Sequence, residues 1–369
     1  MNILILNWKD IKHPEVGGAE IILYELCKRL ARDGHGVSWF CRSFPEGKRF
    51  DSVDQIKIIR MGRNRVLMYL LAPVYYWLLR KKPDIVLDCS NTIFWQTPFW
   101  ATKSKRVGYL NQMAKEVFFY EFPPFISHFG YLVERLQYLT YKNTRFICYS
   151  NSTKYDLVSV GIPERNIGVF SLGVDHNRYE PGEKANYPLF LTVSRLVKMK
   201  RNDLVIKAFK GVFNKHNDAK LTIVGNGYER KRLEEIRDAL GLGEAVYFVD
   251  KDNLFFNKNV KDQKVKLMQQ AWALIFPSVK EGWGMTITEC AACWTPSIVT
   301  DVSGLRDSVK KGKTGLMVSS NPKVAELRDQ MLKIVEDRKL REKLSQNAYL
   351  SAKGFDWDKS YREFKKLLL

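Results

Sequence analysis

Short apolar runs alternate along the chain with longer stretches in which apolar residues recur every three or four positions. Continuous apolar runs are typical of strands buried on both faces, and the longer stretches between them are typical of crossover helices. In the first half this pattern predicts strands at Asn2–Leu6, Val37–Cys41, Ile56–Ile59, Asp84–Asp88, Arg106–Leu110 and Arg145–Tyr149. Ala19–Arg32 is the clearest helix, because its apolar positions recur at helical spacing.

The alternation stops over Ser171–Pro188 and then restarts. This stretch is rich in Gly, Pro and polar residues, so we expect an interdomain linker. The second half predicts strands at Leu189–Val193, Lys220–Val224, Val246–Val249, Ala273–Phe276 and Ser297–Thr300. Phe355–Leu368 is expected to form the last helix. The pattern therefore predicts an α/β fold of two Rossmann-like, doubly wound domains facing across a cleft, with ligands at the carboxyl ends of the strands.

The composition is that of a folded globular protein, with 45% hydrophobic and 27% charged residues in a chain of 369. The net charge of +20 attracts anions of any kind, including anionic lipid and phosphorylated substrates. Nucleic acid is not an expected partner, because no aromatic-basic RNA motif or helix-turn-helix is evident.

The six cysteines lie mostly inside apolar runs, and the opening MNILILNWKD lacks the basic start of a secretory signal. We therefore expect reduced thiols and a cytoplasmic protein. Cys290 and Cys293 form a CxxC that could indicate redox or metal chemistry. No second pair or His cluster accompanies them, so packing in an apolar helix is the favoured interpretation.

Two loops after predicted strands combine glycine or basic residues with a following helix. Gly17 and Gly18 precede the first helix, where backbone N–H groups can face an anion; a tight strand-to-helix turn is the alternative. Arg195 and Lys200 share the loop VSRLVKMKRND and could clamp a diphosphate, unless the loop is simply a solvated basic one. The stretch VGNGYER, which includes Asn226, departs from a dinucleotide fingerprint and argues against an oxidoreductase.

The most specific stretch is PSVKEGWGMTITECAACWTP, residues 277–296. Glu281 lies in its loop and Glu289 on the helix that follows, and carboxylates accept hydrogen bonds from the vicinal hydroxyls of a sugar or a ribose. The N–H groups around Gly284, Met285 and Thr286 can meet phosphate or sugar oxygens at the helix start. The alternative is a surface Glu plus an ordinary charge at a helix terminus.

Glu281–Glu289 resembles the E-x7-E motif of the retaining family-4 glycosyltransferases (glycosyl transferases group 1) of GT-B fold. Ser194–Leu196 with Lys200 is similar to that family's G/S-R-L…K element. Further stretches fall in family order over nearly the whole chain: PEVGGAE, SNSTKYDL, LGVD, VGNG, GLRD and KTGLMV.

The resemblance implies an N-terminal acceptor-side domain over residues 1–175 and a nucleotide-sugar-binding domain over 186–354, with the last helix, 355–369, crossing back onto the first. It implies a UDP- or GDP-hexose donor, transfer to a glycan or lipid-linked acceptor with retention of configuration, and no metal or other cofactor. By position, the residues that it assigns to catalysis are Glu281, Arg195 and Lys200. The residues that it assigns to donor binding are Gly17, Gly18, Arg195, Lys200, Asn226, Val249, Gly284, Met285, Thr286 and Glu289.

One position departs from the family pattern. Many relatives carry a histidine beside the transferred sugar, and the matching residue here is Asn111, followed by Gln112. Asn can hydrogen-bond a sugar or acceptor hydroxyl, but it cannot carry positive charge or move a proton. An alternative function is therefore a non-catalytic nucleotide-sugar-binding or scaffold subunit that partners an active transferase.

Two aromatic and apolar stretches stand out in the first half. Arg63–Lys82 has basic flanks and is too short to span a bilayer, and Val117–Tyr141 is dense in Phe and Tyr. The first could be a buried crossover helix. The other interpretation is contact with an anionic membrane surface at its inner face, which would suit a lipid-linked acceptor.

Overall fold

The computed structural model describes residues 1–250 and 258–369 and divides into two compact units. The first unit comprises Met1–Lys115, His128–Gly173 and Trp357–Leu369. The second comprises Glu116–Ser127 and Val174–Asp356. Residues 116–127 fall in the second unit, whereas the sequence resemblance places them in the first domain. They belong to the second unit because helix α4 (Val117–Glu121) contacts the 3-10 turn η3 (Lys198–Lys200).

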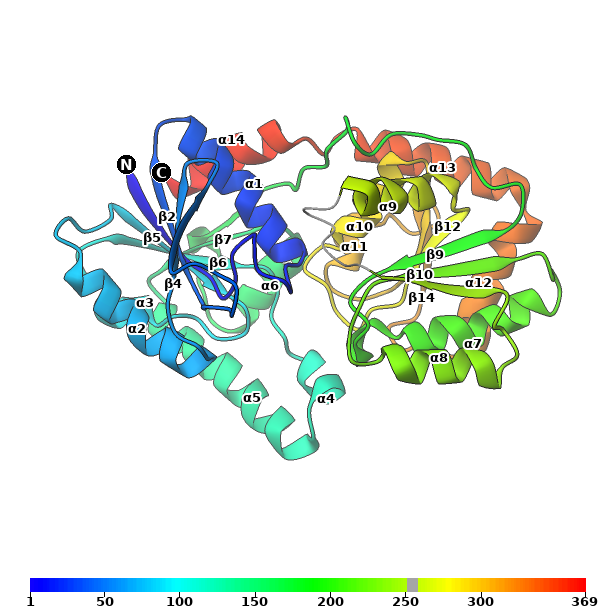
Figure 1. Ribbon diagram of the computed structural model, residues 1–369, viewed down its shortest axis with the longest axis horizontal. Helices are drawn as coiled ribbons and strands as arrows, with labels where there is room; N and C mark the ends of the chain where they lie inside the picture. The colour runs from blue at the N-terminus through cyan, green and yellow to red at the C-terminus, as the bar shows by residue number, and fades with distance from the viewer. Residues whose placement is uncertain (251–257) are drawn as a thin grey trace. The chain divides into compact units, whose positions relative to one another are not determined.

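The first unit is built on a sheet in which all neighbouring strands are parallel except β3 and β4 (Figure 1). Its order is β3-β4-β2-β1-β5-β6-β7-β8. The strands are β1 (Asn2–Leu6), β2 (Gly36–Cys41), β3 (Phe50–Val53), β4 (Ile56–Arg60), β5 (Ile85–Ser90), β6 (Lys105–Leu110), β7 (Arg145–Cys148) and β8 (Ile167–Val169). Every strand predicted for this half is present, with ends shifted by up to two residues. β3 and β8, the two edge strands, were not predicted because edges are short and lack burial on both faces.

Helices cover both faces of this sheet. They are α1 (Gly18–Arg32), α2 (Arg65–Leu78), α3 (Thr97–Trp100), α5 (Pro124–Leu136), α6 (Asn151–Ser159) and α14 (Trp357–Leu368), of which α5 begins in the second unit. The last helix, α14, packs on α1, where Asp358 pairs with Arg29 at 2.9 Å and Tyr361 donates to Asp33 at 2.6 Å. Phe364 of α14 is fully buried.

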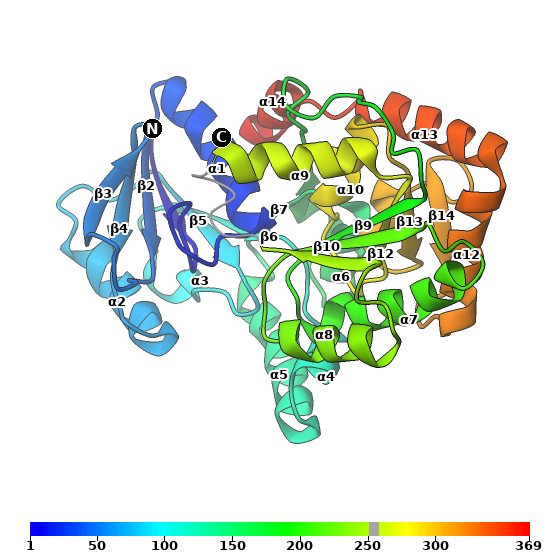
Figure 2. The same ribbon diagram turned by 45° about the vertical axis from the view of Figure 1, so that its right-hand side comes forward.

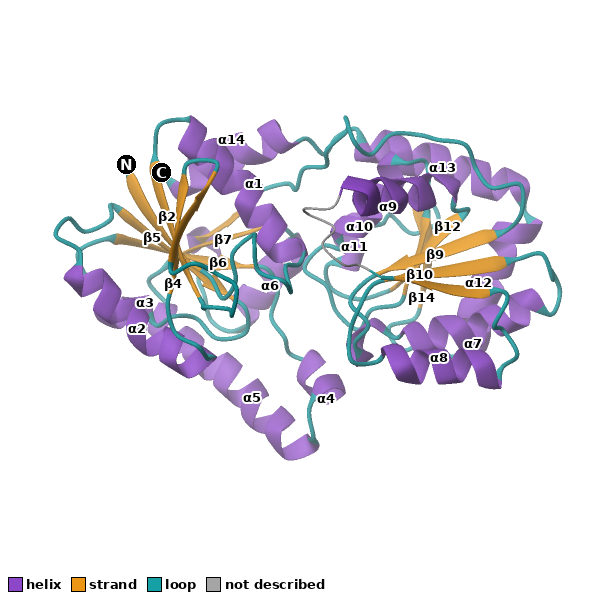
Figure 3. Ribbon diagram, in the orientation of Figure 1, coloured by secondary structure: helices purple, strands orange, loops and turns teal. Residues whose placement is uncertain are grey.

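The second unit is built on a fully parallel sheet of order β11-β10-β9-β12-β13-β14 (Figure 3). The strands are β9 (Leu189–Val193), β10 (Lys220–Val224), β11 (Val246–Val249), β12 (Ala273–Phe276), β13 (Ser297–Thr300) and β14 (Gly315–Val318). The five strands predicted here are confirmed at both ends. β14 was not predicted as a strand; it begins at Gly315, where a Cβ would lie 2.4 Å from the carbonyl oxygen of Ser297.

Both faces of this sheet are buried under helices (Figure 2). Along β9 the side chains alternate, so that Phe190 belongs to one apolar cluster and Leu191 to the other. The helices are α7 (Asn202–Phe213), α8 (Arg230–Ala239), α9 (Lys258–Gln270), α10 (Met285–Ala292), α11 (Leu305–Ser308), α12 (Val324–Glu336) and α13 (Arg338–Ala352).

The cysteines are buried free thiols, and burial raises the pKa of Cys290 and Cys293 above that of an ordinary thiol. Both pack in an apolar cluster on one face of the second sheet, as the favoured interpretation of the CxxC had it. Within residues 1–250 and 258–369, no group of three or more His, Cys, Asp or Glu side chains is placed to hold a metal. Among the helices of this described part, none combines the length and apolar character needed to cross a bilayer.

Candidate functional site

The loops at the carboxyl ends of β9 and β10 are held together by two glycines. A Cβ on Gly225, whose φ is +148°, would lie 1.8 Å from the carbonyl oxygen of Ser194. A Cβ on Gly227 would lie 2.2 Å from the carbonyl oxygen of Leu196. Between the glycines, Asn226 accepts the Leu196 N–H through its main-chain oxygen at 2.9 Å. The glycines therefore allow the backbone contact that positions the loop from Ser194 to Lys200.

Lys200 and Glu281 meet although they are far apart in the sequence. The Lys200 ammonium pairs with the Glu281 carboxylate and lies 5.1 Å from the centre of the Phe276 ring. Burial lowers the pKa of Lys200, while the neighbouring Glu281 opposes that shift. The structure thus brings together a buried cation and a carboxylate from the loops that follow β9 and β12.

Arg195 follows Ser194 in the loop after β9, and its side chain is exposed. Its positive charge also lowers the pKa of Lys200. Among the residues that the structure describes, the guanidinium of Arg195 has no ion-pair partner. It is therefore available to bind an anion beside the Lys200–Glu281 pair, which is what the sequence analysis expected of it.

The loop that carries Glu281 is fixed by glycines and continues into α10. Gly284 caps α10 with a φ of +84°, so Met285 and Thr286 form the first turn of that helix. Gly304 has a φ of +82°, and a Cβ there would lie 2.0 Å from the carbonyl oxygen of Glu281. Helix α10 therefore starts where expected, directly after the loop that holds Glu281.

Glu289 has partners that the sequence analysis missed. Its Oε2 accepts from the Lys264 ammonium at 2.6 Å, and the Tyr179 hydroxyl also hydrogen-bonds the carboxylate. All three side chains are largely buried. Burial opposes ionisation of Glu289, but the charge and hydrogen bond of Lys264, with the hydrogen bond from Tyr179, together outweigh burial and hold the pKa of the carboxyl below its ordinary value. No spacing in the sequence indicated this pair, because Lys264 lies on α9 and Glu289 on α10.

Val249 lies at the carboxyl end of β11, and its main-chain oxygen accepts the Gly225 N–H at 2.9 Å. This hydrogen bond joins the loop after β10, which contains Gly225 and Gly227, to the carboxyl end of β11. The expected donor-site residues of the second half therefore lie on loops or helix starts after its strands, except Val249, the last residue of β11, and Glu289, which lies further along α10.

The remaining expected residues belong to the first unit. Gly17 is the N-cap of α1, but its N–H donates to the Glu20 carboxylate at 2.9 Å, so this N–H is already used. Gly18 begins the helix. After β6, the Asn111 side chain accepts from the Tyr149 hydroxyl at 3.1 Å. The buried Oε1 of Gln112 has no hydrogen-bond partner among residues 1–250 and 258–369, so a hydroxyl donor would satisfy it.

Residues 116–127 reach the loop that holds Lys200, which no sequence signal predicted. The Glu121 carboxylate accepts the Met199 N–H at 2.8 Å and the Tyr228 hydroxyl. Tyr120 accepts from Arg201, whose guanidinium lies 5.1 Å from the centre of its ring. We call Glu116–Ser127 the arm; it braces the turn that ends at Lys200.

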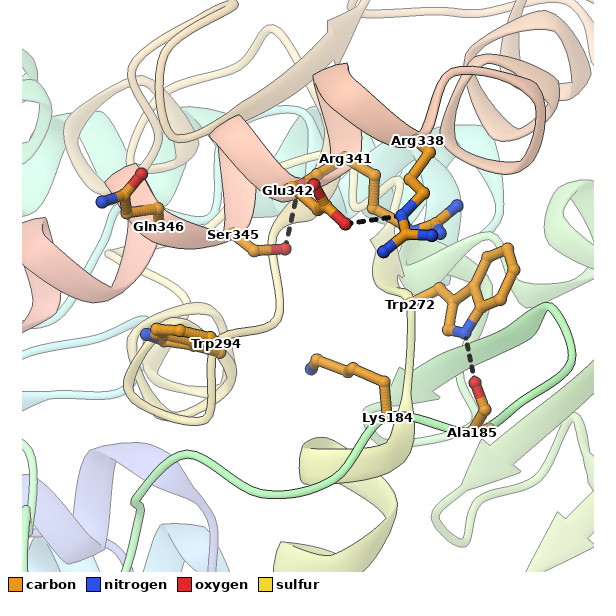
Figure 4. A pocket seen from close by; sticks show the side chains of 9 residues that line it. All are labelled: Lys184, Ala185, Trp272, Trp294, Arg338, Arg341, Glu342, Ser345 and Gln346. Atoms are coloured by element: carbon orange, nitrogen blue, oxygen red, sulfur yellow. Dashed lines mark hydrogen bonds and ion pairs between the residues drawn. The ribbon is translucent and has the colours of Figure 1, made fainter.

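A cavity of about 560 Å³ lies in another part of the second unit (Figure 4). It lies beside α13 and the linker and is lined by Lys184, Ala185, Trp272, Trp294, Arg338, Arg341, Glu342, Ser345 and Gln346. Lys184 donates to the Thr295 hydroxyl at 2.5 Å and to two main-chain oxygens. None of the expected donor-site residues lines this cavity.

Comparisons with known proteins cover both halves of the chain. The family model Glycosyltransferase Family 4 matches residues 16–178, and the model Glycosyl transferases group 1 matches residues 174–351. Uncharacterized glycosyltransferase MJ1178 of Methanocaldococcus jannaschii is 28% identical over 63% of this chain and 61% of its own length. MJ1607 of the same organism is 26% identical over 86% of this chain and 85% of its own length.

Among solved structures, Anabaena Alr3699/HepE in complex with UDP-glucose superposes with a TM-score of 0.78 and 18% identity, covering 100% of this chain and 99% of that one. The fold is therefore GT-B, with two Rossmann-like domains, as the sequence analysis expected. The matched models, from residue 16 to residue 351, carry the family assignment. The chain is a glycosyltransferase of the group 1 family, glycosyltransferase family 4.

Proposed function

We propose that this glycosyltransferase takes a hexose from a UDP- or GDP-hexose and transfers it, with retention of configuration, to a glycan or lipid-linked acceptor. The observation that carries the proposal is the Lys200–Glu281 pair with the exposed Arg195 beside it. Two cations and a carboxylate on neighbouring loops suit a substrate that has a diphosphate at one end and hydroxyls at the other. The UDP-glucose bound by HepE is a donor of the proposed class.

Each residue has a chemical task in this proposal. Arg195 and Lys200 stabilise the negative charge that develops on the departing diphosphate, so the role of a metal is filled by two fixed cations. Glu281 accepts hydrogen bonds from hydroxyls of the transferred sugar, and its pairing with Lys200 holds it oriented. Glu289, held by Lys264 and Tyr179, accepts hydrogen bonds from the ribose hydroxyls.

The first-unit residues are assigned to the acceptor side. Gln112 offers its unpartnered Oε1 to a sugar or acceptor hydroxyl, and Asn111, held by Tyr149, lies next to it in the chain. Gly17 and Gly18, at the start of α1, are instead assigned to donor binding. All the cysteines are free thiols, as in proteins of reducing compartments, which supports a cytoplasmic location for the reaction.

The test is a panel of UDP- and GDP-hexoses, with thermal shift reporting binding and nucleotide release reporting turnover. A donor that binds the folded state raises its melting temperature by mass action. Lys200→Met should lower kcat about 10²–10³-fold, because it removes one stabilising group from the developing charge. Lys198→Met, an exposed lysine of the same turn, is the matched control and should keep wild-type turnover.

Circular dichroism of both variants separates loss of chemistry from loss of folding. Full turnover in Lys200→Met would refute the assigned role. A wild-type protein that binds nucleotide yet neither hydrolyses nor transfers any donor would favour the alternative, a non-catalytic nucleotide-sugar-binding subunit.

A further inference from the structure

Helix α5 turns Glu134 inward and large apolar side chains outward, and the turn after it, η1 (Gln137–Tyr141), buries the polar Gln137 beside the aromatic Tyr138 and Tyr141. Glu134 is 1% exposed and Gln137 is 7% exposed. Phe129 is 64% exposed, and Leu132 and Leu136 are each more than half exposed. A surface helix of a globular protein normally does the reverse, with its apolar stripe facing the core.

The inward polar groups explain how α5 is held without its apolar residues. Both oxygens of Glu134 accept main-chain N–H groups, from Ala114 at 2.6 Å and Lys115 at 2.8 Å. Gln137 accepts from Phe94 N–H at 2.7 Å and donates to the Thr92 oxygen at 2.9 Å. Because polar side chains fix this helix, the exposed apolar side chains have no role in attaching it to its own unit.

Helix α2 also exposes large apolar side chains on one face. It buries a narrow stripe of Met68, Ala72 and Tyr76. Leu70 and Trp77 are 64% and 59% exposed, and Val74 is 44% exposed. Tyr69, Leu71 and Tyr75 pack partly buried beside this stripe, so α2 is a crossover helix on one face, as expected, and leaves its other face exposed.

The two helices belong to one surface of the first unit. The segment between β5 and α3 lies between them: Ile93 accepts from the Tyr69 hydroxyl of α2 at 2.6 Å, and its neighbours bond to Gln137. Figures 1 and 2 show α2 and α5 on the same side of this unit. We define the apolar face as Leu70, Val74, Trp77, Phe129, Leu132 and Leu136.

Positive charge borders the apolar face. Arg63, Arg80 and Lys81 are exposed at the ends of α2, and Arg135 and Lys142 are exposed on and after α5. Residues 63–82 contain no carboxylate, and the only one within residues 128–142 is the buried Glu134. An apolar surface with basic borders matches the chemistry of an anionic bilayer, where acyl chains meet negative headgroups.

We propose that the apolar face is a docking surface for an anionic lipid bilayer, with α2 and α5 lying in the interface. The inference deepens the proposed function and rests on it in one respect, that the acceptor is lipid-linked. The partner is a membrane and not a second copy of the chain, because two copies would bring basic borders of the same sign together on a chain of net charge +20.

Flotation of the full-length protein with vesicles tests the proposal. The protein should float with phosphatidylglycerol-containing vesicles, float less with pure phosphatidylcholine, and release partly at high salt. The double variant Phe129→Glu/Leu132→Glu should lower partitioning at least about tenfold, since it removes the burial of two large apolar side chains. Phe50→Glu, at a 63% exposed position on edge strand β3, is the matched control and should float like the wild type.

Three outcomes would overturn the proposal. The wild type could fail to float with anionic vesicles, the double variant could float like the wild type, or Phe50→Glu could lose flotation to the same extent. Sedimentation velocity without lipid tests a fourth outcome that would overturn the proposal. If the wild type is a dimer and the double variant is a monomer, the apolar face is an interface between copies of the chain.

Donor hydrolysis in solution keeps this test separate from the proposed function. The double variant should hydrolyse the donor at the wild-type rate, because its substitutions lie outside the donor site. Loss of flotation with intact hydrolysis supports the docking surface. Absence of hydrolysis in a wild type that floats would instead count against the donor chemistry.

Discussion

At the scale of single residues, two buried lysines each hold one of the two glutamates of the E-x7-E segment. The spacing indicated both carboxylates and the basic loop, so Glu281, Glu289, Arg195 and Lys200 could be predicted. Lys264 could not, because its partnership depends on how α9 and α10 pack. A sequence pattern reports spacing along one element and carries no such information between elements.

The Lys264–Glu289 pair should be important for stability. Lys264→Met leaves the buried Glu289 carboxylate without its counter-charge, so the free energy of unfolding should fall by about 3–5 kcal/mol. Urea unfolding at pH 7 measures this. Lys266→Met, at an exposed position on the same helix, should change stability little.

The pH dependence of that pair has a definite sign. The folded pKa of Glu289 is below its ordinary value, so the pair's contribution is present above the unfolded pKa and is lost as pH falls through the folded one. The stability difference between wild type and Lys264→Met should therefore shrink as urea unfolding is repeated at acid pH. A difference that stays constant down to acid unfolding would contradict the pairing.

At the scale of elements, the buried strands were predictable, and of the edge strands β11 was predicted whereas β3, β8 and β14 were not. β9, β10, β12 and β13 are largely buried, and β11 was predicted from its sequence VYFV although Tyr247 is exposed. β3 is half exposed, and β14 is a short run of three apolar residues after a glycine. The exposure of apolar side chains on α2 and α5 could not be predicted from helical periodicity either. A periodic apolar stripe does not show whether that face packs against the protein or lies exposed.

The glycine contact between the loops of β9 and β10 should tolerate no side chain. Gly225→Ala should destabilise the second unit by about 1–3 kcal/mol through backbone strain alone and weaken donor binding, because the Cβ would displace Ser194. Thermal unfolding with and without nucleotide measures both effects. Gly243→Ala is the matched control, since a Cβ there meets nothing within 4 Å.

The linker lysine Lys184 ties the segment after the first unit to the second sheet. Burial lowers its pKa from 10.5 to about 8, so between these values the unfolded chain binds more protons and stability rises with pH. Over this whole pH range the free energy of unfolding should rise by roughly 3 kcal/mol, since one pKa unit corresponds to about 1.4 kcal/mol.

Urea unfolding from pH 8 to 10.5 measures the effect of Lys184 as the difference between wild type and Lys184→Met. The variant should lose this rise in stability. Lys339→Met, at an exposed position on α13, should keep it. If the free energy of unfolding rises equally with pH in wild type and Lys184→Met, then Lys184 titrates like a solvated lysine and the prediction is wrong.

At the scale of the whole molecule, each unit is discontinuous in sequence. The first unit is closed by α14, whose Phe364 ring lies 5.5 Å from that of Phe170, and the second includes the arm. During synthesis the N-terminal sheet therefore emerges long before the helix that completes it. Its surface for α14 must stay uncovered while the second unit is made, so we expect folding of the first unit to finish only after α14 has been synthesised.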